Sequence, residues 1–219
     1  MDVTQAVLAR RSIRQFLDKP VDMALLRNIL ETARHAPSGG NVQPWQVTVL
    51  AGESLTHLRT AMQGAMATPQ TPEYRIYPAD LPDPWRNRRG ANGEALYGAL
   101  GIGREDKAAR MQQMARNFDF FGAPVGLFLH MPKFMGPPQW ADLGIWLQTV
   151  MLLLVEAGLG SCAQEAWSIY PETVKQVAQI PDDHLLFCGL AIGWPDPDAP
   201  VNSFANARAP LAESARFLD

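Results

Sequence analysis

The chain has 219 residues and a mass of 24.1 kDa, with 47% hydrophobic and 19% charged residues. These values favour a single folded domain over residues 1–219 and exclude a disordered or fibrous chain. A formal net charge of −3 argues against a general binder of nucleic acids or of anionic membranes. We therefore expect no nucleic acid and no membrane among its partners.

Hydrophobic periodicity and turn residues predict both helices and strands, with no internal repeat. In chain order we expect a helix at 2–9, an extended segment at 10–16, a helix at 22–33, a strand at 45–50, helices at 53–66, near 87–100 and at 105–119, a strand at 124–130, helices at 139–158 and 171–179, and a strand at 184–194. The helix at 139–158 is apolar nearly all round, which is typical of a central core helix.

The two cysteines, Cys162 and Cys188, form no CxxC motif and are too few for a disulfide framework. No basic segment followed by an apolar run stands at the N-terminus, so no signal peptide is predicted. Together these features favour a cytoplasmic protein. The four histidines show no metal-ligand spacing, so we predict no metal site.

Two stretches combine polar or charged groups with a defined backbone. The segment Arg10-Arg11-Ser12-Ile13-Arg14-Gln15-Phe16 places three arginines beside a serine hydroxyl, a natural receptor for phosphate, although charge runs are more often solvated surface. The loop Ala36–Trp45 carries two prolines and two glycines. Turn chemistry alone supports a structural connector and a ligand-binding loop equally well.

Residues 68–103 are rich in proline and in aromatic residues, which argues for an ordered functional loop rather than disorder. We expect 68–120 to be a variable lid or substrate region, although for any one aromatic residue core packing is the commoner role. The candidate substrate contacts are Tyr77, Trp85, Tyr97 and Phe120. The basic cluster Arg86-Asn87-Arg88-Arg89 is expected to be a solvated or ion-paired surface.

Four stretches, in order and over nearly the whole chain, resemble the FMN-dependent nitroreductase family. They are Arg10–Phe16, Ala36–Trp45, the turn Gly158–Ser161 after the long apolar helix, and Gly189–Pro195 with Arg208 beyond it. The resemblance implies an α+β, nitroreductase-like fold with a mixed central sheet flanked by helices. It also implies an interlocked homodimer, held by the helix 139–158 and a swapped C-terminal arm at 195–219, with FMN at the interface.

The resemblance further implies the residues that contact the cofactor. These are Arg10, Arg11, Ser12, Arg14, Pro37, Ser38, Gly39, Asn41, Gln43, Gln164, Glu165, Ala166 and Arg208. Arg10, Ser12 and Arg208 match positions that contact the phosphate. Arg14 matches a cation at the flavin ring, where a fixed positive charge tunes the cofactor. The residue that contacts the ribityl chain is not identified.

The activity implied is a ping-pong oxidoreductase in which NADH or NADPH reduces FMN and a nitroaromatic or quinone-like acceptor reoxidises it, with no side chain as nucleophile. Three alternatives remain. One is a flavoenzyme of the same fold with another reaction, either reductive dehalogenation or flavin fragmentation. The second is a non-catalytic FMN-binding protein. The third is a thiol enzyme, for which Cys162 after its glycine-rich turn is expected to be more exposed than Cys188.

Overall fold

A computed structural model describes residues 1–204 and 206–218 of the chain. The helices are α1 (Val3–Ala9), α2 (Met23–Ala33), α3 (Glu53–Ala65), α4 (Trp85–Ala99), α5 (Lys107–Ala115), α6 (Pro137–Glu156), α7 (Pro171–Ala178) and α8 (Pro200–Ser203). The 3-10 turns are η1 (Gly39–Asn41), η2 (Arg116–Gly122), η3 (Glu165–Ile169) and η4 (Leu211–Glu213). The strands are β1 (Gln46–Ala51), β2 (Val125–Pro132), β3 (Gly160–Gln164) and β4 (His184–Gly193).

The four strands form one sheet in the order β1-β2-β4-β3, and each neighbouring pair is antiparallel. This confirms the α+β class. The sheet was expected to be mixed, however, and within the described residues its named strands are antiparallel throughout. A parallel pairing does occur at the outer edge of β3, where Ser12 forms an isolated bridge with Ser161. The segment around Ser12 contacts β3 at this one position, so it adds no fifth strand.

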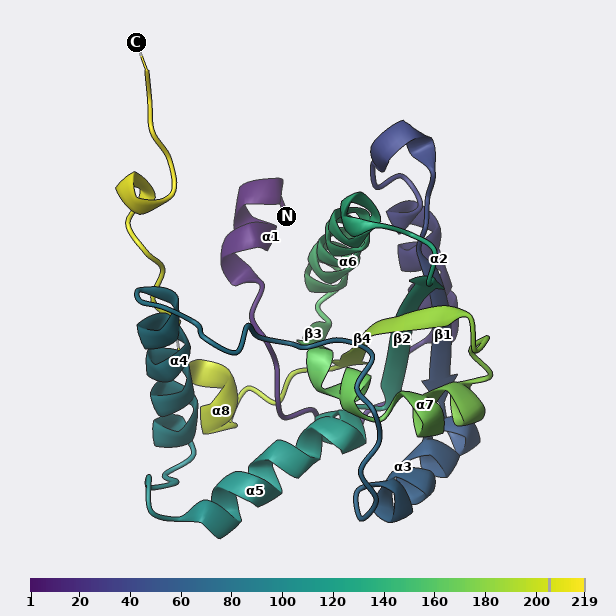
Figure 1. The fold of residues 1–219 in the computed structure, drawn as a ribbon, viewed down its shortest axis with the longest axis horizontal. Coiled ribbons are helices and arrows are strands. Elements are labelled where there is room, and N and C mark those ends of the chain that lie inside the picture. The colour runs from purple at the N-terminus through teal and green to yellow at the C-terminus, as the bar shows by residue number, and fades with distance from the viewer. Residues whose placement is uncertain (205, 219) are drawn as a thin grey trace.

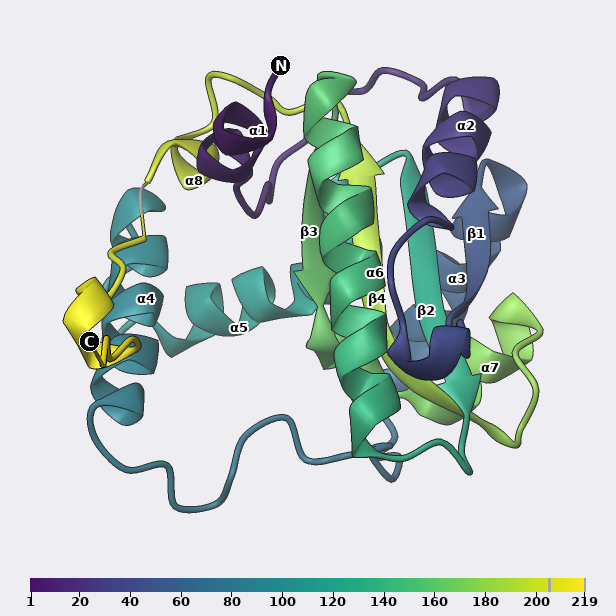
Figure 2. The same cartoon turned by 90° about the horizontal axis from the view of Figure 1, so that it is seen from above.

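Helices cover both faces of the sheet (Figures 1 and 2). On one face, α2 and α6 pack through Leu26, Leu143 and Trp146 against alternate residues of β2 such as Leu127. On the other face, α3 and α7 pack against the intervening residues, including Phe128. This alternation follows from the two-residue period of a strand. The core is therefore divided by the sheet into two layers.

Helix α6 runs the length of the sheet, as expected for the apolar segment (Figure 2). Its buried residues face α2 and the strands, whereas Ile145 is 42% exposed. Among the described residues no helix has the length and apolar character needed to cross a membrane. Helix α2 begins at a capped end, because the N-cap residue Asp22 accepts a hydrogen bond through Oδ1 from Ala24 N at 2.8 Å.

A second group of helices lies beyond the β3 edge of the sheet. Figure 2 shows α4 farthest from the sheet, with α5 leading from it back to β3 and with α1 and α8 nearby. After β4 the chain forms α8, and residues 206–218 continue past α4, where Glu213 pairs with Arg88. The space between this group and the β3 edge contains the candidate site.

Candidate active site

The three arginines and Ser12 of the basic segment meet Arg208 in a cavity of about 190 Å³. The segment is held there by β3, because Ile13 N donates to Ser161 O at 2.9 Å. The C-terminal segment fixes it from the other side, since Asn202 Oδ1 accepts from Arg14 N at 2.8 Å. The structure thus brings together Arg10, Arg11, Ser12, Arg14 and Arg208, which are far apart in sequence.

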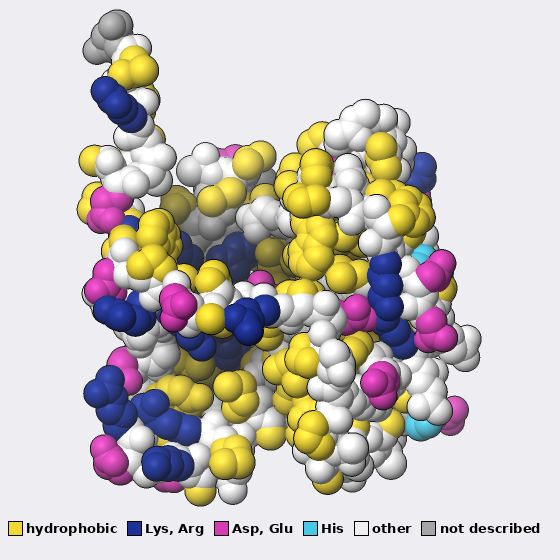
Figure 3. Space-filling model, viewed as in Figure 1, with side chains coloured by type: hydrophobic (Ala, Val, Ile, Leu, Met, Phe, Trp, Pro, Cys, Tyr) yellow, Lys and Arg dark blue, Asp and Glu magenta, His cyan; other side chains and the backbone are white. Residues whose placement is uncertain are grey.

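Positive charge is uncompensated in this phosphate-sized cavity. Within the described chain, no carboxylate lies at salt-bridge distance from any of its four arginines. Figure 3 shows Lys and Arg atoms deep in the hollow at the middle of the molecule, between the α4–α5 group and the sheet. Guanidinium groups gathered without carboxylates repel one another, so the cavity favours an anionic ligand.

A second cavity, of about 430 Å³, adjoins the first, and Arg14 lines both. One wall comes from β3 and η3 and includes Ala163, Gln164, Glu165, Ala166 and Ile169. The facing elements supply Ile76, Tyr77, Arg89, Asn92, Gly93, Leu96, Tyr97, Gln113, Met114, Asn117 and Phe121. The pair of cavities can therefore hold one elongated ligand with an anionic end and an aromatic end.

The β3–η3 wall is fixed by Trp167, which is fully buried over Gly189 of β4. A Cβ on Gly189 would lie 2.6 Å from Trp167 Nε1, so only glycine accommodates the indole. Gln164 Nε2 donates to Asn117 O at 2.7 Å, which turns its side chain toward η2. Partial burial raises the pKa of the Glu165 carboxyl above its ordinary value.

Gln113 and Asn117 also line this cavity, and sequence reasoning did not single them out. Gln113 is buried, yet its Nε2 has no hydrogen-bond partner among the described residues. A buried donor without a partner is costly in a folded protein, so a ligand in the cavity is its natural acceptor. Nothing in the helical period of residues 105–119 distinguishes Gln113 from a solvent-facing residue.

Of the four aromatic residues predicted to contact substrate, Tyr77 and Tyr97 line the second cavity. Each ring is covered by a guanidinium group, Tyr77 by Arg89 at 4.1 Å and Tyr97 by Arg110 at 4.2 Å. Trp85 lies outside the cavity at the first turn of α4 and is 55% exposed.

Phe120 does not line the cavity, contrary to expectation. Both Phe120 and Phe121 have positive φ angles, of 50° and 55°. This backbone turns Phe120 inward, where it is fully buried over Gly126 and lies 4.5 Å from the Trp167 ring, centroid to centroid. Phe121 takes the wall position instead. Phe120 thus supports the cavity from behind.

The loop from Pro37 to Gln43 lies outside both cavities of its own chain. It packs beside α6, where Gly39 N donates to Asp142 Oδ1 at 3.1 Å. Asn41 and Gln43 adopt positive φ angles of 57° and 51°, which are uncommon for residues other than glycine. The structure therefore does not bring the predicted loop contacts Pro37, Ser38, Gly39, Asn41 and Gln43 together with the arginines.

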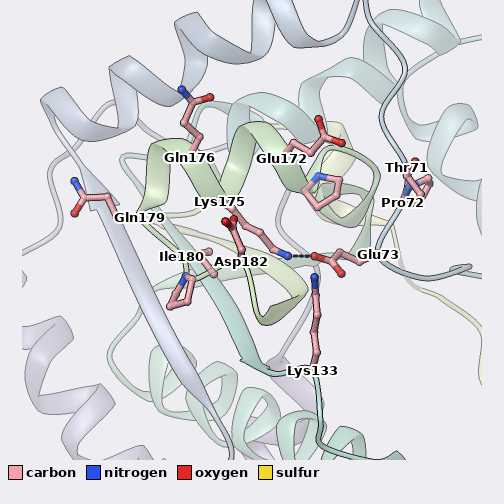
Figure 4. A pocket seen from close by; sticks show the side chains of 12 residues that line it. Thr71, Pro72, Glu73, Lys133, Glu172, Lys175, Gln176, Gln179, Ile180 and Asp182 are labelled. Atoms are coloured by element: carbon pink, nitrogen blue, oxygen red, sulfur yellow. Dashed lines mark ion pairs between the residues drawn. The ribbon is translucent and has the colours of Figure 1, made fainter.

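A separate cavity, of about 830 Å³, lies between residues 71–73 and α7 (Figure 4). Its lining carries three carboxylates, of Glu73, Glu172 and Asp182, against two lysines, and Lys175 forms a buried ion pair with Glu73 (Figure 4). Gln70 Nε2 donates to Thr173 Oγ1 at 2.6 Å nearby. These contacts anchor the start of the 68–120 region on α7 and leave no comparable excess of charge for a ligand.

Both cysteines are buried, Cys162 at 3% and Cys188 at 1% exposure. Cys162 is the more exposed of the two only by this small margin, and it is not accessible, because Ile13 and Phe16 belong to the same core layer as this side chain. Burial raises the pKa of both thiols, so neither is a ready nucleophile. Among the described residues no group of three or more potential metal ligands is found.

Comparison with known proteins agrees with this geometry. The model of the nitroreductase family matches residues 7–194. The chain is 35% identical over 215 residues to a nitrobenzene nitroreductase of Ectopseudomonas oleovorans, covering 95% of this chain and 93% of that protein. It is 35% identical over 217 residues to a 4-nitrobenzoate reductase of Pseudomonas putida, covering 99% and 96%. The crystal structure of the FMN and NADPH-dependent nitroreductase NfnB from Sphigopyxis sp. strain HMH superimposes with a TM-score of 0.98, at 51% identity and 100% coverage of both chains. This chain is a member of the nitroreductase family.

Proposed function

We propose that the chain binds FMN and transfers electrons from NADH or NADPH to nitroaromatic or quinone-like acceptors. The observation that carries this proposal is the group of four arginines, which have no carboxylate partner in the part of the chain that the structure describes. Through Arg14 this group adjoins a larger cavity with aromatic residues in its walls. The names of the relatives, which include reductases of nitrobenzene and of 4-nitrobenzoate, support the same activity.

The residues present fit FMN. Arg10, Arg11, Ser12 and Arg208 supply cationic and hydroxyl donors for a phosphate dianion. The larger cavity offers Ala163–Ala166 as part of one wall, and a buried donor on Gln113 that has no partner among the residues that the structure describes. Bound in this position, FMN would supply the redox chemistry of the reaction.

The chain's own residues would then bind and orient the cofactor and tune its redox chemistry. Arg14 places a fixed positive charge at the junction of the two cavities, where it favours negative charge on whatever lies there. Phe121, Leu96 and Ile76 give the larger cavity apolar surface, which limits water beside the reacting groups. Glu165, whose raised pKa favours the protonated carboxyl, stands at the same wall as a proton carrier.

We also infer a homodimer. Apolar side chains remain exposed on α1 and α6, among them Val3, Leu8 and Ile145. The strained loop Pro37–Gln43 lies outside its own cavities, so in a dimer it would contact the partner's flavin. Asn202 and Arg208 of the expected arm at 195–219 lie at the arginine cavity of their own chain, so we propose a crossing to the partner only for the residues that follow Arg208. Sedimentation at micromolar concentration would give the mass of two chains, and a mass of one chain would refute this.

We further propose one domain over residues 1–219, in which 68–120 forms the acceptor side of the site. The unpaired cysteines of this chain suit a reducing cytoplasm.

The deciding experiment is an absorption spectrum of the purified protein under anaerobic conditions. The protein should be yellow, lose colour when NADPH is added, and regain it when nitrobenzene follows. Steady oxidation of NADPH with the flavin intact would exclude both flavin fragmentation and a purely storage role. A colourless protein that takes up no added FMN would overturn the proposal, as would a yellow protein that NADPH and NADH leave unchanged.

A further inference from the structure

The three arginines of the basic cluster at the start of α4, Arg86, Arg88 and Arg89, have different partners. Arg86 pairs with Asp83 at 2.8 Å, and Arg88 pairs with Glu213 of the C-terminal segment. Both fit the expectation of an ion-paired surface. Arg89 differs, because no carboxylate of the described chain lies at salt-bridge distance from it. Its guanidinium group lies instead over the Tyr77 ring, at 4.1 Å from the centroid.

Arg89 and Tyr77 line the larger cavity from the side of α4. The other charged residues in its lining are Arg14 and Glu165. Arg14 also lines the phosphate-sized cavity, so its charge is expected to interact with the cofactor rather than with the acceptor. Arg89 is therefore the cation of this lining that the phosphate-sized cavity does not share.

We propose that Arg89 binds an anionic substituent of the acceptor, so that the site favours nitroaromatics that carry a carboxylate over neutral ones. This inference rests on the proposed nitroreductase function. Arg89 of α4 and the β3–η3 wall line the same cavity from different elements, so a para-substituted ring that spans it would place its two substituents against different walls. The guanidinium group is already oriented by its stacking on Tyr77, so little side-chain freedom is lost when the anion binds.

The expected selectivity is modest because Arg89 is exposed to solvent. Solvent-exposed ion pairs contribute up to about a fivefold change in an equilibrium constant. The preference should also shrink as salt is added, because the interaction is screened.

The test compares 4-nitrobenzoate with 4-nitrobenzamide, which has nearly the same shape and no charge. In the parent protein and in Arg89→Gln, the ratio of kcat/KM for the two acceptors is measured at low salt and at high salt. Arg89→Gln should lower this ratio by up to about fivefold at low salt, and by less at high salt. The matched control is Arg86→Gln on the same helix, which removes an ion-paired arginine outside the cavity and should leave the ratio unchanged.

An unchanged ratio in Arg89→Gln would overturn the inference. Binding of a cofactor phosphate by Arg89 would appear differently, as a raised KM for NADPH with no change for NADH and no change in the acceptor ratio, and would also overturn it. Failure of the proposed function is distinguishable from both, because the parent protein would then reduce neither the acid nor the amide.

Discussion

Gly189→Ala tests whether the packing beneath the site holds its wall in place. Gly189 pairs with Gln164 across β3 and β4, and the Trp167 ring covers it. An alanine Cβ would lie 2.6 Å from Trp167 Nε1 and 3.0 Å from Phe120 Cε1. Both rings are fully buried, so neither can move toward solvent to make room. The substitution must displace Trp167, and with it the neighbouring residues Glu165 and Ala166.

The magnitude follows from two contributions. Overpacking a filled core costs about 1–3 kcal/mol, and we take about 2 kcal/mol for the displacement of the two rings. The hydrogen bond from Trp167 Nε1 to Gln164 Oε1, at 3.3 Å, is strained or lost, at about 1 kcal/mol. We therefore expect Gly189→Ala to lower the free energy of unfolding by about 3 kcal/mol and to weaken FMN retention.

Urea denaturation followed by circular dichroism, at fixed protein and FMN concentrations, measures the effect. With an m-value of about 2 kcal/mol/M, the midpoint should fall by about 1.5 M urea. The control is Gly64→Ala in α3, where an added Cβ meets no atom within 4 Å and helix propensity should raise stability by up to about 1 kcal/mol. A Gly189→Ala midpoint equal to that of the parent would refute the packing argument.

Three further predictions concern charge. Arg208→Gln should weaken FMN binding about tenfold, as expected for a lost charge-assisted hydrogen bond, whereas Arg14→Gln should mainly slow reduction of the bound flavin. Ultrafiltration measures FMN binding, and stopped-flow absorbance measures the rate of flavin reduction. Equal losses of binding and of reduction rate in the two variants would contradict these separate roles. Lys175→Met leaves Glu73 buried without its partner and should lower the free energy of unfolding, measured by urea titration, by about 3 kcal/mol. Replacing Glu73 by Leu in the same variant should largely restore the lost stability. Burial, together with the adjacent His184, lowers the pKa of His130 in β2 to about 4, below the unfolded value near 6.5, so its contribution to stability is complete above pH 6.5 and is lost as the pH drops toward 4. Parallel pH profiles for the parent and His130→Gln would show that another group is responsible.

Much of the fold could be predicted because its main elements each bury one face. Helices α2 and α3 carry apolar residues at helical spacing, and the structure places them within a residue or two of the expected bounds. The sharing of one cavity by Arg10, Ser12 and Arg208 followed only from the family resemblance. The basic segment alone did not indicate its distant partner Arg208.

What sequence reasoning missed depends on contacts between distant residues. Phe120 turns inward because Gly126 and Gly189 leave space for its ring, and no local pattern encodes that space. Arg89 resembles Arg86 in sequence, but its role depends on Tyr77, which reaches it from the preceding loop. The loop after α2 was expected at the cofactor, and within one chain it lies apart from both cavities.

The two walls of the larger cavity differ in how firmly they are held. The β3–η3 wall rests on fully buried Trp167, whereas α4 has no buried residue at all. A helix held only by surface contacts opens at a much smaller free energy than the whole domain unfolds. Amide hydrogens of α4 would therefore exchange with solvent through local fluctuations while those of β2 and β4 stay protected. Acceptors of different bulk would be admitted on the α4 side, and substitutions there would change which acceptors fit at little cost to folding. The same architecture makes α4 the natural starting point for directed evolution of acceptor range.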